Sequence, residues 1–251
     1  MKFPEEFIEK LAEAKSIIFF TGAGISAESG ISTFRGKDGI WNKLKPEELA
    51  NFDAFLRNPD MVWEWYQYRR KIVHEAKPNA GHIAIKEFEK YYDTKVITQN
   101  VDNLHGRAGS KTIYELHGNI ERNFCIDCCS YIGMDEFENT DKVPHCKKCG
   151  GLIRPDVVWF GEMLPQEVFM NSEMAARRCD ICFVVGTSAI VYPAAYIPHT
   201  AKQAGAYLVE INIEKTEFSS SADLSLIGAA GEILPRVWEE VKRIYNLKPY
   251  V

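Results

Sequence analysis

The 251-residue sequence predicts an α/β fold: an open, mostly parallel sheet with helices on both faces, together with a small second domain. Three observations support this prediction. Hydrophobic runs of strand length alternate along the chain with segments of helical periodicity. Several of these runs are apolar almost throughout, which is typical of strands that helices cover on both sides. Two stretches interrupt the alternation, and together they form the expected second domain.

The expected elements follow one another from the N-terminus to the C-terminus. Six hydrophobic runs are interpreted as strands: Ser16–Thr21, Lys95–Gln99, Thr112–Leu116, Ile181–Gly186, Ala206–Ile213 and Ala222–Ile227. Six segments with the helical period are interpreted as helices: Glu5–Ala14, Met61–Ala76, His82–Tyr91, Pro165–Ala176, Pro193–Ala204 and Ile233–Tyr245.

The two interruptions differ in character. Residues 36–78 contain helices and turns but no convincing strand, and residues 123–154 are short, polar segments that carry cysteines. We expect both to be insertions that together make the small domain. Residues 1–35, 79–122 and 155–251 then form the larger, Rossmann-like domain.

Composition and charge exclude several classes of protein. Thirty basic against thirty-five acidic residues give a net charge of −5, whereas general nucleic-acid and membrane-surface binders are usually basic. No apolar run approaches the roughly 18–20 residues of a membrane span, and the amphipathic N-terminus lacks the apolar core of a signal peptide. We therefore expect a cytoplasmic protein that binds neither membranes nor nucleic acid directly.

A glycine-rich loop follows the first predicted strand. Gly22, Gly24 and Ala27 fit the G-x-G-x-x-G/A pattern, in which backbone N–H groups approach a dinucleotide pyrophosphate at a helix N-terminus. Any tight strand-to-helix turn also favours glycine, so the pattern alone is weak evidence. A dehydrogenase would place a second strand with a terminal acidic residue about 20 residues further on. Residues 33–41 are instead rich in turn formers, which disfavours a dehydrogenase.

Two Cys-x-x-Cys pairs, separated by seventeen residues, match the spacing of four-thiolate zinc sites. Four protein thiolates leave no open coordination position, so we expect one structural Zn²⁺ rather than a catalytic metal. Acidic residues are interspersed through this segment, which argues against a nucleic-acid-binding ribbon. Cys129 is a less regular alternative ligand, and Cys179 and Cys182 are interpreted as core thiols. The predicted zinc ligands are Cys125, Cys128, Cys146 and Cys149.

Six motifs in this order resemble those of the sirtuins, the NAD-dependent protein deacylases of the Sir2 family. One is the cysteine pairs; the others are Gly22–Arg35 (GAGISAESGISTFR), Thr98–His105 (TQNVDNLH), Leu116–Gly118 (LHG), Val158–Glu162 (VWFGE) and Gly186–Ser188 (GTS). The resemblance covers essentially the entire chain. Ser32 departs from the family, which usually has proline there.

The resemblance implies a reaction in which the acyl oxygen of a modified lysine attacks C1′ of the nicotinamide ribose of NAD, so that nicotinamide leaves and the acyl group ends on ADP-ribose. It identifies His117 as the general base, and histidine suits this task because its ordinary pKa is near 6.5. His105 is the competing candidate, to which we assign a structural role. With His117, the resemblance assigns catalytic roles to Asn100 and Asp102.

The resemblance also implies where NAD binds. Gln99, Asn100 and Asp102 follow a predicted strand, at the edge where open α/β sheets bind ligands, and would line the pocket for nicotinamide and its ribose. As ordinary turn formers, Asn100 and Asp102 could instead merely cap a turn. The other predicted NAD-binding residues are Gly22, Ala23, Gly24, Ile25, Ala27, Thr33, Phe34, Arg35, Trp41, Gly186, Thr187, Ser188, Asn212, Glu214 and Ala230.

The protein substrate is expected to bind as an added β-strand along the segment that contains Val158, Phe160, Gly161 and Glu162. In the predicted helix Met61–Ala76, Arg69 falls within the apolar stripe formed by Met61, Val62, Trp65, Ile72, Val73 and Ala76, with Tyr66 on its flank. Periodicity alone favours an intrachain carboxylate as partner of Arg69, or a side chain that reaches solvent.

The pair Tyr66-x-x-Arg69 resembles the YxxR motif of class III sirtuins, whose acyl pocket accepts succinyl and malonyl groups. We therefore expect a monomeric NAD-dependent lysine deacylase that removes succinyl or malonyl as well as acetyl groups and yields nicotinamide and O-acyl-ADP-ribose. The alternatives are an enzyme that is mainly a deacetylase, a mono-ADP-ribosyltransferase, and a non-catalytic regulator that binds NAD or ADP-ribose.

Overall fold

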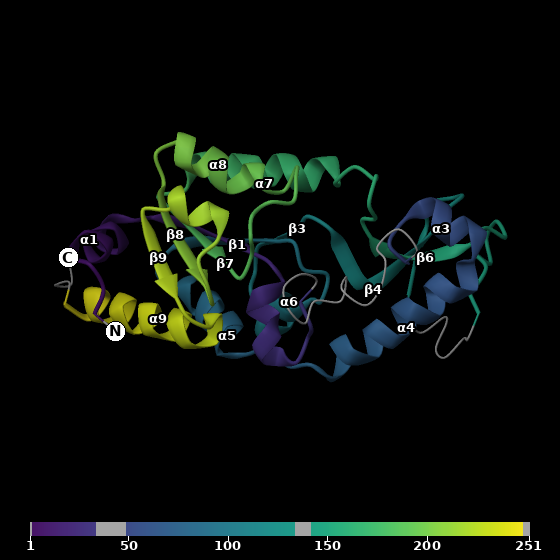
Figure 1. Ribbon diagram of the computed structural model, residues 1–251, viewed down its shortest axis with the longest axis horizontal. Helices are drawn as coiled ribbons and strands as arrows, with labels where there is room; N and C mark the ends of the chain where they lie inside the picture. The colour runs from purple at the N-terminus through teal and green to yellow at the C-terminus, as the bar shows by residue number, and fades with distance from the viewer. Residues whose placement is uncertain (1, 34–48, 134–141, 248–251) are drawn as a thin grey trace.

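The computed structural model describes residues 2–33, 49–133 and 142–247. A parallel sheet of six strands lies in the larger part of the molecule (Figure 1), in the order β3-β2-β1-β7-β8-β9. Counted along the chain, this is the order 3-2-1-4-5-6 of the Rossmann fold. The strands are β1 Ser16–Thr21, β2 Asp93–Thr98, β3 Ile113–Glu115, β7 Ile181–Val185, β8 Tyr207–Asn212 and β9 Leu224–Ile227. The predicted α/β fold is confirmed.

Alternation along each strand divides the core of this part into two layers, because successive side chains point to opposite faces. Ile17 and Phe19 of β1 belong to a cluster that includes α1, α5 and α9, whereas Ile18 and Phe20 belong to a cluster that includes α7 and α8. Figure 1 shows these two groups of helices on opposite sides of the sheet. The helices are α1 Glu5–Glu13, α5 Ala80–Phe88, α7 Gln166–Arg178, α8 Tyr196–Gln203 and α9 Ala230–Leu247.

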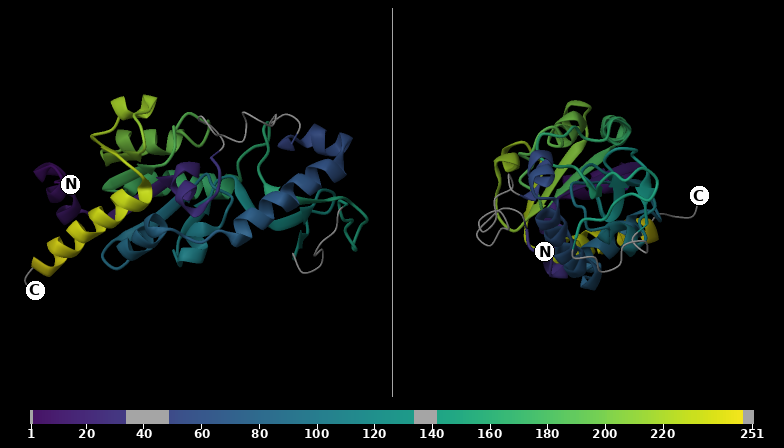
Figure 2. Two further views of the ribbon diagram at one scale, coloured as in Figure 1. Left: turned by 60° about the horizontal axis from the view of Figure 1, so that its bottom comes forward. Right: turned by 90° about the vertical axis from the view of Figure 1, so that its right-hand side faces the viewer.

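The second part of the molecule lies at the other end of its long axis (Figure 2). It contains an antiparallel sheet in the order β5-β4-β6. Trp63 and Trp159 are the largest side chains buried in its core. Its elements are α3 Phe52–Arg57, α4 Pro59–Glu75, β4 Gly118–Cys125, β5 Tyr131–Ile132 and β6 Ile153–Val157.

The antiparallel strands are absent from the sequence prediction. β4 runs without interruption from residue 118 to 125, and β6 from 153 to 157. The domain boundaries drawn from the sequence, at 122/123 and 154/155, fall inside these two strands. Both strands mix polar and apolar residues, and β6 contains Pro155, a residue that disfavours a strand, so hydrophobic patterning did not reveal them.

Helix α4 begins two residues before the predicted start, because the side chain of Asn58 caps it by accepting a hydrogen bond from the N–H of Met61. The predicted apolar stripe is partly wrong. Met61 is 40% exposed, while Trp63 and Arg70 are buried together with Val62, Tyr66, Arg69 and Val73. The buried face is wider than one stripe and is centred near Tyr66, because α4 packs against β4 and against Trp159. No helix within the described ranges is both long and apolar enough to cross a membrane.

The order of the strands reverses between β1 and β7, and the loops that follow these two strands meet there. The N–H of Gly24 donates to the carbonyl oxygen of Gly186 at 2.8 Å. A Cβ atom on Gly24 would lie 2.7 Å from the Cα of Gly186, and one on Gly22 would lie 2.6 Å from the Cβ of Thr187. Gly22 and Gly24 are therefore required for contact between the two loops. The 3₁₀ helix η1 Ala23–Ser29 depends on this contact for its position.

Replacing Gly24 with alanine is expected to destabilise the fold by about 1–3 kcal/mol, because backbone atoms of Gly186 would have to move to admit the methyl group. Urea denaturation measures this change. The matched control is Gly205→Ala: the φ of Gly205 is +96°, and nothing lies within 4 Å of the place that a Cβ atom would take. That control reports only the cost of left-handed backbone, roughly 1–2 kcal/mol. Unchanged stability of Gly24→Ala would contradict the proposed role of the close contact.

Candidate active site

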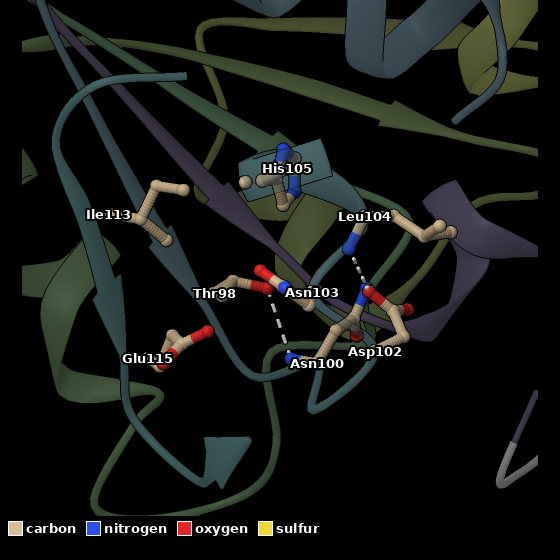
Figure 3. Close-up of a pocket in the computed structure, with 9 residues that line it drawn as sticks. Thr98, Asn100, Asp102, Asn103, Leu104, His105, Ile113 and Glu115 are labelled. Atoms are coloured by element: carbon tan, nitrogen blue, oxygen red, sulfur yellow. Dashed lines mark hydrogen bonds between the residues drawn. The ribbon is translucent and has the colours of Figure 1, made fainter. Parts of the chain in front are cut away.

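Polar side chains gather at the carboxyl ends of β1 and β2, where an open α/β sheet binds its ligands. Figure 3 shows a small pocket beyond β2 that is lined by Thr98, Asn100, Asp102 and His105 among others. Asn100 and Asp102 are each 5% exposed, and His105 is 2% exposed. The sequence-predicted residues Asn100 and Asp102 are thus brought together at one buried position.

A chain of hydrogen bonds joins these groups to the glycine-rich loop. The side-chain amide of Asn100 donates to the carbonyl oxygen of Gly22 at 3.0 Å and to Oγ of Ser26 at 3.2 Å. Ser26 in turn donates to Oδ2 of Asp102 at 2.7 Å, and the N–H of Leu104 donates to Oδ1 of Asp102 at 3.0 Å. Both carboxylate oxygens of Asp102 therefore have donors.

Burial raises the pKa of Asp102. The hydrogen bonds from Ser26 and Leu104, and the positive charge of Arg69, act in the opposite direction. The carboxylate is thus held in a poorly solvated position by donors and by one nearby cation. Such an environment is typical of a functional carboxylate, although it also occurs in structural networks.

His117 follows β3 and is anchored through one ring nitrogen. Its Nδ1 lies 2.9 Å from the carbonyl oxygen of Gln99, and a carbonyl can only accept, so Nδ1 carries the proton. In the neutral ring, Nε2 is then the basic nitrogen. Burial lowers the pKa of His117, and the bond to Gln99 partly opposes this shift. A neutral imidazole with a fixed tautomer can act as a general base at neutral pH.

His105 is less suited to this role. Its Nε2 lies 3.0 Å from the hydroxyl of Thr21, and its ring contacts that of His82 at a centroid distance of 4.8 Å. Burial lowers the pKa of His105 well below its ordinary value and that of His82 to about 4. His82 Nε2 and His105 Nδ1 are buried without a hydrogen-bond partner among the described residues. Two buried neutral imidazoles are consistent with the structural role expected for His105.

The other predicted NAD-binding residues occupy the same edge of the sheet. Gln99 donates to the hydroxyl of Thr187 at 3.0 Å, and the side chain of Asn212 donates to the carbonyl oxygen of Thr187 at 3.2 Å. These bonds link the ends of β2, β7 and β8. Ser188 is half-buried beside Thr187 and Glu214 is exposed beyond β8, whereas Ala230 is 5% exposed within the core cluster of α9.

The other predicted residues of the glycine-rich segment lie in η1 or at the end of the first described range, and some lie outside the described residues. Ala23 and Ala27 belong to η1, and Ile25 is fully buried in the core beneath that turn. Thr33 is the last residue of the first described range. Phe34, Arg35 and Trp41 lie outside the described residues.

Tyr66 and Arg69 are both buried on α4, with exposures of 2% and 7%. The hydroxyl oxygen of Tyr66 accepts a hydrogen bond of 2.8 Å from Nε1 of Trp159. The guanidinium of Arg69 lies over the ring of Trp65, 5.3 Å from its centroid. Burial lowers the pKa of Arg69, while attraction to Tyr66 and Asp102 raises it. Arg69 is therefore within electrostatic range of the pocket that Asp102 lines.

The segment 158–162 is paired inside the chain. The N–H of Val158 donates to the carbonyl oxygen of His117 at 3.0 Å, and the N–H of Phe160 donates to that of Ala50 at 2.9 Å. Glu162 accepts hydrogen bonds from the guanidinium of Arg154 and from the N–H of Trp159. Phe160 is 48% exposed, and Gly161 has a φ of +89°. An added substrate strand would have to use the groups of this segment that these bonds leave available.

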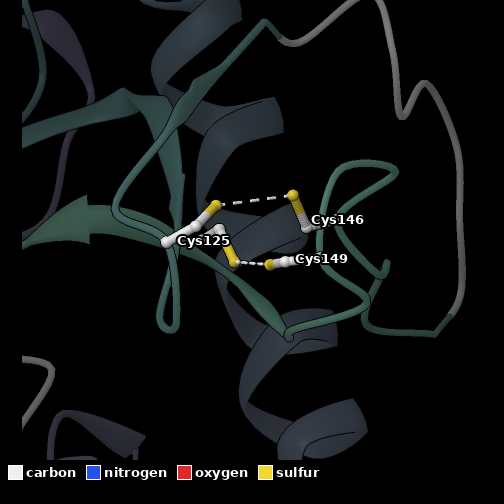
Figure 4. A group of neighbouring side chains, drawn as sticks. Cys125, Cys146 and Cys149 are labelled. Carbon is white, nitrogen blue, oxygen red and sulfur yellow. Dashed lines mark hydrogen bonds between the residues drawn. The ribbon is translucent and has the colours of Figure 1, made fainter.

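The four predicted zinc ligands come together in the small part of the molecule (Figure 4). Their sulfur atoms all lie within 4.8 Å of one another. The Sγ atoms of Cys125 and Cys149 are 3.4 Å apart, and those of Cys128 and Cys146 are 3.8 Å apart. Tetrahedral Zn–S bonds of about 2.3 Å require S···S distances of about 3.8 Å. Cys129 is exposed and outside this cluster, and Cys179 and Cys182 are buried in the core.

Sequence reasoning missed two residues of the site. Ser26 is fully buried and holds Asp102, and Trp159 holds Tyr66. Both stand inside motifs that were recognised. A hydroxyl in the otherwise apolar run of the glycine-rich loop was an available signal for Ser26, but nothing in the sequence pairs Trp159 with Tyr66.

Comparison with known proteins agrees with this geometry. Residues 22–193 match the model of the Sir2 family. The chain is 53% identical over 235 residues to NAD-dependent protein deacylase 2 of Pyrobaculum aerophilum, covering 93% of this chain and 94% of that protein. It is 52% identical over 240 residues to the NAD-dependent protein deacylase of Pyrococcus furiosus, covering 93% and 96%.

Solved structures give the same result. A mutant Sir2 homologue in complex with ADP-ribose superposes with a TM-score of 0.95 at 44% identity, covering 99% of this chain and 100% of that chain. A complex of Sir2 with a p53 peptide and NAD⁺ gives a TM-score of 0.85 at 35% identity, covering 97% and 100%. This chain therefore belongs to the Sir2 family and, like the relatives that it matches over almost its whole length, is an NAD-dependent protein deacylase.

Proposed function

We propose that this enzyme removes acidic acyl groups, chiefly succinyl and malonyl, from lysine side chains and retains some activity on acetyl-lysine. The observation that carries the proposal is the burial of Tyr66 and Arg69 together on α4, with exposures of 2% and 7%, alongside the electrostatic coupling of Arg69 to Asp102. Helix α4 thereby brings a buried guanidinium close to the pocket beyond β2. A guanidinium can bind a carboxylate through two parallel hydrogen bonds, and the hydroxyl of Tyr66, one helical turn earlier, can add a third.

The same coupling favours a second candidate, a deacetylase. In that case Asp102 is itself the anion that the buried guanidinium requires, and Arg69 serves the structure. The two candidates differ in one respect: only the first needs Arg69 to contact the substrate. Substitution of Arg69 therefore separates them.

Residues at the sheet edge fit NAD as co-substrate. Buried amide and carboxylate groups, on Asn100 and Asp102, are hydrogen-bonded to the loop that begins at Gly22, and the backbone of this loop in turn contacts Gly186. When bound, NAD supplies a cleavable bond at C1′ of its nicotinamide ribose and the ADP-ribose that receives the acyl group. Asn100 and Asp102 would hold the nicotinamide end, and Asn212 with Glu214 the adenosine end.

His117 is the proposed general base. The bond from Nδ1 to Gln99 fixes the ring, so that Nε2 can take up a proton from a ribose hydroxyl. The peptide around the acyl-lysine is proposed to extend along residues 158–162. The complex of a Sir2 homologue with a p53 peptide supports a peptide as the substrate.

One structural Zn²⁺ is proposed at the four cysteines. The thiolate donor set and the sulfur distances fit zinc, and no ligand position would remain for substrate. The ion would hold the turn at Cys125–Cys128 against the turn at Cys146–Cys149. It would take no part in the reaction.

The Arg69→Met variant is expected to lower the ratio of kcat/KM for succinyl-lysine over acetyl-lysine peptide by roughly 10- to 100-fold, because a hydrogen bond to a charged group contributes about 1.5–3 kcal/mol. Release of nicotinamide and acyl-ADP-ribose, followed by mass spectrometry, measures both rates. The control is Lys71→Met, which removes an exposed cation from the same helix α4. It should leave the ratio unchanged. An unchanged ratio in Arg69→Met would show that Arg69 does not bind the acyl group and would contradict the proposed preference.

The His117→Ala variant should lower kcat/KM by about 10²- to 10⁴-fold without loss of NAD affinity. The native enzyme should lose activity as the pH falls through the pKa of His117, and this midpoint should lie below 6.5 because burial lowers that pKa. The pH profile of kcat/KM gives the midpoint. Substitution of the exposed His74 by alanine is the control and should preserve the profile. Full turnover in His117→Ala would identify another base.

The purified protein is expected to contain one equivalent of zinc, measured by inductively coupled plasma mass spectrometry. Cys146→Ser should lose most of this zinc and unfold at a lower temperature, because the metal stabilises the folded chain by its binding free energy. Cys129→Ser is the matched control, since Cys129 is adjacent in sequence to Cys128 but outside the cluster. Equal zinc content in both variants would contradict the assigned ligands.

A further inference from the structure

Trp159 connects the proposed peptide-binding segment to helix α4. It is 2% exposed, and its indole N–H donates to the hydroxyl oxygen of Tyr66 at 2.8 Å. The two residues are 93 positions apart in the chain. This bond therefore links the segment 158–162 directly to the helix that carries the Tyr66/Arg69 pair.

The position of Trp159 is fixed on several sides. The guanidinium of Arg154 lies 3.3 Å from the centroid of its ring, and Phe55 packs against it at a centroid distance of 5.3 Å. Its own backbone N–H donates to Glu162 at 2.8 Å, and Glu162 is in turn held by Arg154. A ring confined in this way cannot turn its Nε1 away from Tyr66 without disrupting several contacts.

An indole nitrogen can only donate, so the hydroxyl oxygen of Tyr66 must be the acceptor in this bond. The hydroxyl's own proton is therefore directed elsewhere. Burial raises the pKa of Tyr66 to about 12, so the hydroxyl keeps that proton at working pH. Among the described residues, the bond from Trp159 is the one hydrogen bond that the Tyr66 hydroxyl makes. Tyr66 is thus presented as a donor.

We infer that Trp159 is a specificity-determining positioning residue: by occupying the acceptor side of the Tyr66 hydroxyl, it directs the proton of that hydroxyl toward the distal carboxylate of an acidic acyl group. The inference rests on the proposed acyl specificity and deepens it. A carboxylate accepts hydrogen bonds and donates none, whereas the methyl end of an acetyl group does neither. Fixing Tyr66 as a donor therefore favours succinyl over acetyl.

The test is Trp159→Phe, which removes the N–H donor and keeps an aromatic ring over Arg154. The ratio of kcat/KM for succinyl-lysine over acetyl-lysine peptide should fall about fivefold, since one such hydrogen bond contributes about 1 kcal/mol. In a double-mutant cycle with Tyr66→Phe, the second substitution should add little to the first, because both remove the same interaction. Phe52→Leu is the control: Phe52 borders Arg154 and Trp159 but does not contact the Tyr66 hydroxyl. It should leave the ratio unchanged.

A second measurement avoids substitution of Trp159. The ¹⁵N–¹H signal of its indole, assigned by its shift in Tyr66→Phe, should move when succinyl-lysine peptide binds and much less with acetyl-lysine peptide. An unchanged succinyl/acetyl ratio in Trp159→Phe, or full additivity in the cycle, would overturn the inference while Arg69→Met still showed the acidic-acyl pocket. An unchanged ratio in Arg69→Met would overturn the proposed specificity, and the inference with it.

Discussion

The site depends on hydrogen bonds that satisfy polar groups in a place with little water. Leaving one such buried group without a partner costs about 1–3 kcal/mol. Asn100, Ser26 and Asp102 avoid this cost by bonding to one another and to the carbonyl oxygen of Gly22. Each of these bonds spans more than seventy residues of sequence, so the network also fixes the glycine-rich loop against the end of β2. The bonds that hold the edge of the sheet together are thus the same bonds that form the pocket.

Helix α4, in the small part of the molecule, carries Tyr66 and Arg69. Three contacts hold this helix along its length. At its beginning, Asp60 accepts the N–H of Val143 at 2.9 Å. In its middle, the buried guanidinium of Arg70 donates to the carbonyl oxygen of Ile120 at 2.7 Å. At its end, Arg107 donates to the carbonyl oxygen of Val73 at 2.8 Å, as cations commonly do at helix C-termini. A helix held at both ends and in the middle gives Tyr66 and Arg69 fixed positions relative to Asp102.

The sequence was sufficient for the parallel sheet because a buried strand such as Ile181–Val185 is apolar throughout. It was also sufficient for the cysteine cluster, since metal-ligand spacing is local. It was insufficient for β4 and β6, whose pairing is long-range and whose residues follow no strict alternation. The face of α4 was misjudged for a related reason. Burial on that helix is decided by Trp159 and β4, which are distant in sequence, and periodicity reports only the helix itself.

Acyl specificity in this enzyme would depend on the direction of hydrogen bonds as well as on charge. Arg69 provides a positive charge near the pocket, but Asp102 already draws on that charge, as their mutual effect on each other's pKa indicates. A carboxylate of the substrate therefore competes with one of the protein. Because Trp159 occupies the acceptor side of the Tyr66 hydroxyl, this hydroxyl can bind a further partner only by donating its proton. The donors to Asp102 are Ser26 and Leu104, so the hydroxyl of Tyr66 offers the substrate carboxylate an interaction for which Asp102 does not compete. The tyrosine would then add to the arginine in distinguishing an acidic acyl chain from a short neutral one.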